Sequence, residues 1–396
     1  MTVSGQPEEI AHLRSTSAVR ERCKLVHRFA ADGHSRFFTL EESRLDAVAD
    51  YVAAVTRGAY PDLAIPYHSR WRHFCAGGIN RWGKLAQSVP AHPVERARMA
   101  VDLATVSVLL DAGAGIAWRY REGESGLCLA RSEGLAVASL DMFRAGAFSS
   151  APDRPCRVDD AALARIDASI LARHFQVAEA NPLVGLEARV ALLRRLGRAL
   201  GERGDLFGCV PARPGNLVDY FTSIAVNGSV SAATVLTTLL ESLASIWPSG
   251  LVLHGIPIGD AGRHRAVGTD DMTDDVVPFH KLSQWLTYSL IEPFAGAGLT
   301  MERLDELTAL PEYRNGGLLV DLGAIRLRPG IDAQTPHAVQ SELVVEWRAK
   351  LGLGGAFTLP HMLQGGTWSA GRKIARELRP PDGPSPIAVA ADGTVF

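Results

Sequence analysis

Apolar residues recur every three or four positions along much of the chain, which is the spacing of one face of an α-helix. Residues 39–42 match a capping box, and the apolar positions that follow predict a helix ending near Gly58. Residues 93–110 are apolar on most sides and predict a buried helix. Residues 231–246 predict another amphipathic helix, which Trp247-Pro248 ends.

Two prolines predict further helix starts. Asn181-Pro182 combines a capping residue with a proline in the first turn, and the leucines and valines that follow line one face as far as Leu200. The arginines of this segment, Arg189 among them, lie mostly off that face. Pro278 is predicted to open the next helix.

The last hundred residues change character. Short runs rich in valine, isoleucine and leucine predict strands within residues 318–328, 342–347 and 386–396. Asp392-Gly393 is typical of a hairpin turn. We therefore predict a mainly α protein with a small β-sheet, an α+β fold in which the C-terminal part contributes most of the sheet.

The composition also predicts an organisation into regions. Proline and aspartate concentrate between residues 149 and 160, which indicates a connecting loop. We expect a flexible tail over residues 1–14, a helical region over 15–150, and a second helical region with the small sheet over 151–396. The two helical regions are expected to form one compact unit with a central cleft.

Charge and cysteine content narrow the function. The chain has 396 residues and a formal net charge of −2, so no strong global field attracts nucleic acid or an acidic membrane. The five cysteines form no CxxC pair, which argues against a disulfide framework or a structural zinc site. No signal peptide and no run of about 18 apolar residues is visible. These features predict a cytoplasmic protein with no nucleic-acid or membrane partner and leave its oligomeric state open.

Several common catalytic and cofactor motifs are absent. Residues 78–84 superficially fit a phosphate-binding loop, but Leu85 stands where magnesium needs Ser or Thr, and Trp82 is bulky where the backbone should curl. The chain has no Gly-x-Ser-x-Gly, no His-Glu-x-x-His and no dinucleotide glycine fingerprint. We expect neither a metal ion nor a cofactor.

The first candidate segment, residues 66–74, is dense in groups that bind small ligands. Guanidinium groups bind phosphate or carboxylate, and an aromatic ring can stack on a planar group. The candidate residues are His68, Arg70, Trp71, Arg72 and His73. The alternative, which we weigh equally, is a rim of exposed charges over a buried tryptophan.

The second candidate segment lies on the helix predicted after residue 278. Lys281, Gln284 and Tyr288 share one helical face, and buried polar side chains need partners, of which a ligand is one. His280 and Trp285 belong to the same candidate set. The alternative is an internal ion pair of Lys281 with a carboxylate of Glu292, Asp305 or Glu312.

The third candidate segment carries Glu312, Tyr313 and Arg314 directly before two glycines. Adjacent glycines let a backbone approach a ligand closely, so the polar trio could be presented to that ligand. A strand-like apolar run that includes Asp321 follows. The alternative is a surface turn with a solvated Glu-Arg pair.

Stretches spread over nearly the whole chain resemble the uracil catabolism protein four family of bacterial and fungal pyrimidine degradation, a domain of unknown function. The resemblance is carried by residues 65–74, 108–115, 131–135, 181–187, 277–288, 310–317 and 365–368. In one place the chain departs from the family pattern. We expect another helix after residues 346–349, whereas Lys350-Leu351-Gly352 follows at once.

A second, more distant resemblance concerns chemistry. Glu312-Tyr313-Arg314 is similar to the Asp-Tyr-Arg of queuosine salvage glycosylases, and residues 280–284 are similar to their Tyr-Lys-Arg-Ala-Gln helix. Residues 342–346 resemble the strand that follows. Those enzymes cleave the ribosyl C1'–N bond of a nucleoside 5'-monophosphate without a metal, on a fold like that of DNA glycosylases. The resemblance therefore implies a DNA-glycosylase-like helical architecture.

Together the two resemblances imply a metal-independent hydrolase that cleaves the C1'–N bond of a ribosylurea, or of its 5'-phosphate, and releases urea. Such cleavage builds positive charge on the sugar, so a carboxylate must lie near C1'. Our first choice for it is Glu312, with Asp321 and Asp111 behind it. The rival interpretations are an amidohydrolase that acts on the ureido group and a non-catalytic protein that binds a nucleotide or a pathway partner.

The same resemblances imply roles for the other candidates. The leaving urea needs a proton or hydrogen bonds, for which we expect Tyr313, Tyr288 or His280. A tryptophan, Trp71 or Trp285, would pack on the planar urea. The cations expected to bind a 5'-phosphate are Lys281, Arg70, Arg72 and Arg314.

Overall fold

The computed structural model describes residues 7–247, 250–329 and 358–387. The chain divides into two compact units, and each is built from separate chain segments. Unit 1 consists of Met1–His68, Ala261–Gln284 and Leu304–Ala390. Unit 2 consists of Ser69–Asp260, Trp285–Arg303 and Ala391–Phe396. Helix α14 (Lys281–Gly296) therefore begins in unit 1 and continues in unit 2.

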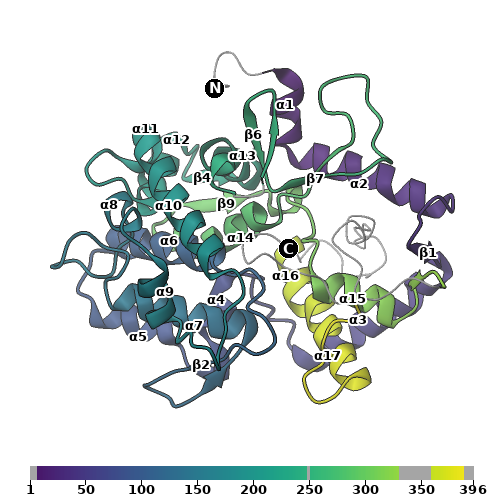
Figure 1. Cartoon of the computed structure of the whole chain (residues 1–396), viewed down its shortest axis with the longest axis horizontal. Coiled ribbons are helices and arrows are strands. Elements are labelled where there is room, and N and C mark those ends of the chain that lie inside the picture. The colour runs from purple at the N-terminus through teal and green to yellow at the C-terminus, as the bar shows by residue number, and fades with distance from the viewer. Residues whose placement is uncertain (1–6, 248–249, 330–357, 388–396) are drawn as a thin grey trace. The chain divides into compact units, whose positions relative to one another are not determined.

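Helices dominate both units, which confirms the predicted mainly α class with small β elements (Figure 1). Among the described residues, the strands form five two-stranded sheets. Strand β4 (Ser229–Ser231) pairs in parallel with β9 (Thr300–Glu302). The antiparallel pairs are β1 (Phe38–Leu40) with β10 (Ile325–Leu327), β2 (Tyr120–Arg121) with β3 (Cys128–Leu129), β5 (Leu251–Leu253) with β6 (Ile256–Gly259), and β7 (Ala261–Arg263) with β8 (Val276–Pro278).

The described strands are spread from Phe38 to Leu327, so the described part of the chain does not concentrate them at the C-terminal end. The strand predicted from Leu318 was wrong at its start, because Leu318–Asp321 belong to a helix and only Ile325–Leu327 form a strand. The strand predicted within residues 342–347 and the Asp392-Gly393 hairpin lie outside the described residues.

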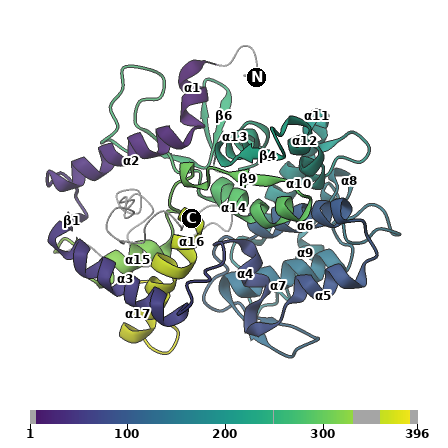
Figure 2. The ribbon, with the colours of Figure 1, turned by 180° about the vertical axis from the view of Figure 1, so that it is seen from behind.

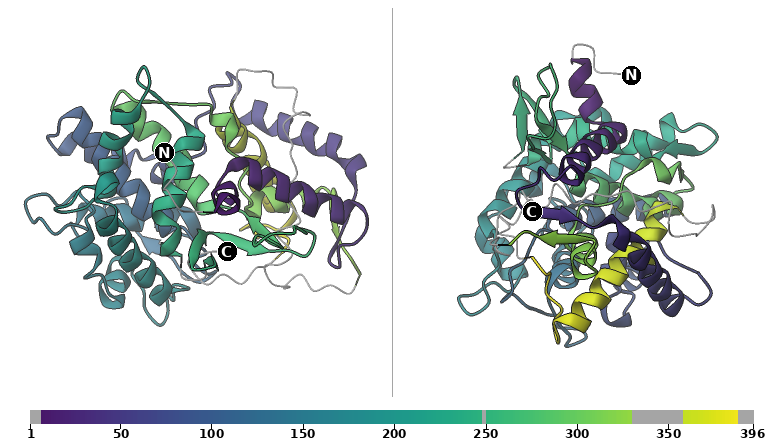
Figure 3. Two further views of the ribbon diagram at one scale, coloured as in Figure 1. Left: turned by 90° about the horizontal axis from the view of Figure 1, so that it is seen from above. Right: turned by 90° about the vertical axis from the view of Figure 1, so that its right-hand side faces the viewer.

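Unit 1 packs its helices around a small apolar core. Val48, Val52, Leu318, Leu319 and Ile374 contribute to that core, and each of these residues is buried. In Figures 1 and 2 the helices that carry them lie side by side, and the right-hand view in Figure 3 shows α17 next to α3. The helices of this unit are α1 (Glu8–Leu13), α2 (Thr16–Ala31), α3 (Leu45–Ala59), α15 (Tyr313–Asp321), α16 (Leu359–Met362) and α17 (Trp368–Leu378).

Helix α1 lies within the range for which we predicted a flexible tail. Its apolar residues Ile10 and Leu13 are fully buried. A segment that buries two large aliphatic side chains is held to the protein by the hydrophobic effect, so residues 8–13 are part of unit 1.

Unit 2 is built around helix α6 (Pro93–Leu109), which is buried continuously from Met99 to Leu109. This confirms the buried helix predicted over residues 93–110. Helix α13 (Ala232–Leu243), capped by Ser231, confirms the prediction over 231–246. None of the described helices is both long and apolar enough to cross a membrane. The other helices of this unit are α4 (Arg70–Phe74), α5 (Arg81–Ser88), α7 (Arg131–Arg144), α8 (Asp160–Leu163), α9 (Ala168–His174), α10 (Leu186–Glu202), α11 (Gly204–Phe207) and α12 (Leu217–Ile224).

Three predicted helix starts were wrong by several residues. Thr39 pairs with Arg326 between strands β1 and β10, so α3 begins only at Leu45. Pro278 likewise pairs with Ala261 in β8, and α14 begins at Lys281. In both cases pairing with a distant strand overrides the local capping signal.

The third wrong start is that of α10. This helix begins at Leu186, after Gly185 in a left-handed conformation with φ of 70°. The Asn181 side chain binds the backbone of Arg119 and Gln176 instead of capping the helix. An asparagine that finds partners in a neighbouring loop no longer signals where a helix begins.

Arg189 of α10 was predicted to lie off the buried face but is fully buried. Its guanidinium donates to the carbonyl oxygens of Leu110, Ala112 and Gly113, the last two at 2.9 Å each. Leu110 caps the C-terminal end of helix α6, where carbonyl groups lack partners within the helix, and Ala112 and Gly113 lie in the loop that follows. Arg189 therefore closes the end of the central helix of unit 2.

We predict that Arg189→Met lowers the free energy of unfolding by about 2–4 kcal/mol, because it leaves buried carbonyl groups without donors. Urea denaturation of the purified protein measures this. Arg198→Met on the exposed face of the same helix is the matched control and should change stability by less than about 0.5 kcal/mol. Equal stability of the two variants would show that Arg189 has no such role.

Candidate functional site

Glu312 is the residue immediately before helix α15 and caps its first turn. Its carboxylate accepts hydrogen bonds from the backbone N–H groups of Arg314 at 3.1 Å and Asn315 at 2.8 Å. The first N–H groups of a helix have no partner within the helix and carry its positive dipole end, so a carboxylate is stabilised there. This capping fixes the position and orientation of the carboxylate.

The electrostatic environment of Glu312 is mixed. Burial raises the pKa of its carboxyl above the usual range, whereas the positive charge of Lys281 and the two backbone N–H groups act in the opposite direction. The net result is a raised pKa. Lys281 is the first residue of α14, so the structure brings two of the predicted segments together in unit 1.

Asn315 adds a group that the sequence analysis did not single out. Its amide nitrogen donates to the Leu310 carbonyl at 3.0 Å. Its amide oxygen, Oδ1, is buried and has no hydrogen-bond partner among the described residues. Buried polar atoms are nearly always hydrogen-bonded, so this acceptor, on the residue whose backbone N–H binds Glu312, is a candidate partner for a ligand N–H or O–H group. In the sequence, the feature that could have pointed to Asn315 is its position three residues after Glu312, the spacing between a helix cap and the backbone group it binds.

The remaining residues of the third segment do not gather at one point. Asp321 lies at the other end of α15, about 13 Å along the helix axis from Glu312. It forms two hydrogen bonds with Arg379, at 2.8 and 2.6 Å. Arg314 donates to the carbonyl oxygen of Gly383 at 2.9 Å. Tyr313 is the first residue of α15 and directly follows Glu312.

The start of α14 is held by polar contacts within unit 1. His280 has a positive φ of 46°, and its Nε2 is 2.8 Å from the carbonyl oxygen of Leu13. The Gln284 side chain is fully buried and binds the hydroxyl and backbone N–H of Thr308 at 2.7 and 2.8 Å. Protein partners thus engage both candidates, whereas the Lys281 charge acts on Glu312.

A second polar cluster lies in unit 2 around Arg70. The Arg70 guanidinium is fully buried and contacts Ser107 Oγ and Asp111 Oδ2, each at 2.8 Å. Trp285 Nε1 donates to the same Asp111 oxygen at 3.2 Å. Burial lowers the pKa of Arg70, and Asp111 partly offsets this. Arg70 Nη2 has no hydrogen-bond partner among the described residues.

The other residues of the first segment have structural contacts. Trp71 Nε1 donates to the Ser289 carbonyl at 2.8 Å, and Arg72 forms an ion pair with Glu292. The His73 ring lies edge-on to Trp285, with ring centroids 5.8 Å apart. Trp71 is buried, as the second interpretation predicted, but Arg70 and His73 are buried with it and do not form a rim of exposed charges.

Two more candidates complete the account. Tyr288 is fully buried in unit 2. His68 belongs to unit 1, where its Nδ1 lies 2.8 Å from Gln364 Oε1. Burial lowers the pKa of His68 to about 4, so its ring is neutral at pH 7.

Among the described residues, no group of three or more His, Cys, Asp or Glu side chains is arranged to bind a metal ion.

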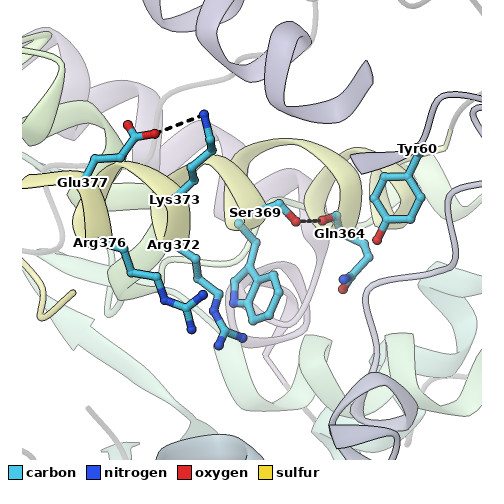
Figure 4. A pocket seen from close by; sticks show the side chains of 8 residues that line it. Tyr60, Gln364, Ser369, Arg372, Lys373, Arg376 and Glu377 are labelled. Atoms are coloured by element: carbon cyan, nitrogen blue, oxygen red, sulfur yellow. Dashed lines mark hydrogen bonds and ion pairs between the residues drawn. The ribbon is translucent and has the colours of Figure 1, made fainter. Parts of the chain in front are cut away.

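Unit 1 also contains a groove of about 540 Å³ along α17, whose lining residues were not among the predicted site residues. Figure 4 shows the Arg372 and Arg376 guanidinium groups next to each other on one side of the helix. Trp368, Arg372 and Arg376 recur every four residues, a spacing that the sequence already displayed. The lining residues are Tyr60, Gln364, Trp368, Ser369, Arg372, Lys373, Arg376 and Glu377.

The chain belongs to a protein family whose members are described as "Protein of unknown function (DUF1688)". The family model matches residues 12–353 and 350–396. The two matched stretches overlap at residues 350–353, just after Ala349, where we expected a further helix; this segment lies outside the residues that the structure describes. The family assignment made from the sequence is thereby confirmed.

Two curated relatives align over nearly their whole length. Protein urg3 of Schizosaccharomyces pombe is 38% identical over 414 residues, covering 98% of this chain and 99% of the relative. Uracil catabolism protein 4 of Lachancea kluyveri is 36% identical over 437 residues, again covering 98% and 99%. Both alignments are longer than this chain, so the relatives carry additional residues.

Helix α17 comes very close to the helix that Glu312 caps, and this generates a prediction. A Cβ atom added at Gly371 would lie 2.0 Å from the Arg314 carbonyl oxygen. We therefore predict that Gly371→Ala lowers the free energy of unfolding by about 2–4 kcal/mol. Chemical denaturation provides the measurement. Gly296→Ala, where no atom lies within 4 Å, is the control and should not destabilise the protein.

Proposed function

We propose that the protein acts in uracil or pyrimidine catabolism as an N-ribosyl hydrolase. The reaction would cleave the C1'–N bond of a ribosylurea, or of its 5'-phosphate, and release urea without a metal ion. The name of the Lachancea kluyveri relative supports the pathway. The resemblance of Glu312-Tyr313-Arg314 and residues 280–284 to the queuosine salvage glycosylases supports the reaction class.

The environment of Glu312 is the observation that carries the proposal. As the C1'–N bond breaks, its electron pair leaves with nitrogen and positive charge develops on the sugar. A fixed carboxylate stabilises that charge and can accept a proton from the attacking water. Because its pKa is raised, Glu312 is a stronger base than an ordinary carboxylate, and Lys281 limits that rise so that the group can still ionise.

The atoms of the proposed step balance. Water supplies an OH group to C1' and a proton to Glu312, and Glu312 then passes this proton to the leaving urea nitrogen, which regenerates the carboxylate. The buried acceptor Asn315 Oδ1 would bind an N–H group of the ureido moiety, which orients it beside the carboxylate. Asp321 is not needed, since its charge is compensated by Arg379.

The capping contacts of Glu312 also support a rival, non-catalytic role. A carboxylate that binds two backbone N–H groups could serve only to start helix α15. In that case replacing it would alter stability and leave no reaction to lose. An amidohydrolase, by contrast, would attack the ureido carbonyl and release ammonia directly.

We predict that purified protein releases urea from ribosylurea 5'-phosphate and that Glu312→Gln lowers the turnover rate at least about a hundredfold. A coupled assay with and without added urease separates urea from directly released ammonia. The glutamine oxygen can still accept one backbone N–H group, and the variant removes a half-buried charge. Its melting temperature should therefore stay within about 2 °C of the parent protein.

The controls separate catalysis from folding. Glu302→Gln changes an exposed carboxylate on β9 and should keep full activity. Normal urea release by Glu312→Gln would refute the role of Glu312, and ammonia release in the absence of urease would refute the glycosidic reaction. Loss of activity together with a collapse of the melting temperature would identify Glu312 as a helix cap alone.

A second prediction concerns pH. The active form requires ionised Glu312, so the turnover rate should fall as the pH drops through the raised pKa of this group. The Lys281 charge lowers that pKa, so Lys281→Met should raise it further. The acidic limb of the pH profile should then move to higher pH. Measuring kcat across the range from about pH 4 to about pH 9 tests this, because that range covers the acidic limb of the profile on both sides of neutrality.

Lys281→Arg retains the positive charge and serves as the matched control, with an acidic limb close to that of the parent protein. If Lys281→Met raises KM and leaves the limb unchanged, the lysine binds substrate and does not tune Glu312. That outcome would contradict the electrostatic role assigned to this lysine.

A further inference from the structure

The groove along α17 has the charge balance of an anion-binding site. Among the residues that the structure describes, its walls carry three cationic side chains and one carboxylate, that of Glu377. That carboxylate accepts a hydrogen bond from Tyr51 at 2.9 Å and forms an ion pair with Lys373 at 3.0 Å. Figure 4 shows this ion pair on the opposite side of the helix from the two arginines. Arg372 and Arg376 therefore supply positive charge that Glu377 does not offset.

The two arginines differ in how they are held. The Arg372 guanidinium lies over the Trp368 ring, 4.7 Å from its centroid, and this contact restricts its orientation. Arg376 is exposed, and its guanidinium forms no hydrogen bond or ion pair with the described residues. A pair of guanidinium groups on neighbouring helical turns matches the several oxygens of one phosphate group.

The end of the groove is formed by a π-helical turn, Leu363–Thr367, which joins α16 to α17. Single π turns inside helices are frequent at functional sites. Gly365 fits against Ile65, where an added Cβ would lie 2.8 Å from the Ile65 side chain. The turn therefore depends on a glycine that brings it against the chain segment before His68.

This turn presents the amide of Gln364 to the groove. The Gln364 oxygen is engaged by His68 Nδ1 at 2.8 Å, and because an amide oxygen only accepts, the neutral His68 ring donates this hydrogen bond. The amide NH2 of Gln364 remains as a donor on the groove wall, where Figure 4 shows it together with the Tyr60 hydroxyl. Donors and cations thus line one volume of about 540 Å³, which is large enough for a small ligand.

We propose that this groove is a binding site for a small phosphate monoester. Arg372 and Arg376 would bind the phosphate oxygens, and the Gln364 amide and Tyr60 hydroxyl would bind the organic part. None of these residues takes part in the reaction proposed for Glu312, so the site is a second one and goes beyond that function. Trp368 is a positioning residue, since it orients Arg372.

The test is calorimetric titration of the full chain with ribose 5-phosphate, ribose and inorganic phosphate. We expect ribose 5-phosphate to bind more tightly than either fragment. Replacing both groove arginines, Arg372→Gln with Arg376→Gln, should weaken ribose 5-phosphate binding at least about a hundredfold, or about tenfold for each lost charge-assisted contact. Arg326→Gln, which removes an exposed charge on β10 of the same unit, should leave the Kd unchanged.

Lys281→Met distinguishes this site from the one at Glu312. If Lys281→Met abolishes ribose 5-phosphate binding and the double arginine variant does not, the phosphate binds near Glu312 and the groove proposal is overturned. No heat of binding with any of the three compounds would also overturn it. Loss of binding in the double variant alone supports the groove site whether or not the protein releases urea. Thermal unfolding of each variant confirms that it is folded.

Discussion

The contact between α15 and α17 is the constraint on which both candidate sites depend. Gly371 leaves no room for a side chain against the Arg314 carbonyl, so the two helices are as close as their backbones allow. Helix α15 is capped by Glu312, and α17 carries the arginines of the groove. The apolar core of unit 1 holds the same pair of helices through Leu318, Leu319 and Ile374. The geometry of both sites therefore follows from one packed interface.

Buried polar groups in this protein differ in how completely they are satisfied. Arg189 finds three carbonyl acceptors at the end of α6, and Asp102 binds Arg213 and two backbone N–H groups. Such complete networks stabilise a fold and need no ligand to explain them. Asn315 Oδ1 is different, because it is buried and has no donor within the described part of the chain, and the backbone N–H of the same residue binds a carboxylate of raised pKa. This unsatisfied acceptor adds to the raised pKa of Glu312, which is the observation that carries the proposed reaction.

Arg70 shows why residue type alone is a weak guide to function. Its guanidinium is bound by Ser107 and Asp111 within unit 2, and Asp111 also accepts a hydrogen bond from Trp285. Arg70 and Asp111, which were both predicted to contact a ligand, thus form an ion pair with each other. A fully buried arginine next to a carboxylate is stabilised by that ion pair, so the charge of Arg70 is compensated within unit 2.

The sequence by itself determined the helical class, the family and the long apolar helices such as α6 and α13, because their periodicity extends over several turns. It also placed Glu312, Lys281 and Arg70 among the polar residues of interest. It misplaced the starts of α3, α10 and α14, where distant strands or loops take up the local capping groups. Only the tertiary structure decided that residues 318–321 are helical and that Glu312 caps that helix beside Lys281. Partners separated by tens of residues leave no periodic signal, so their pairing becomes visible only when the chain is folded.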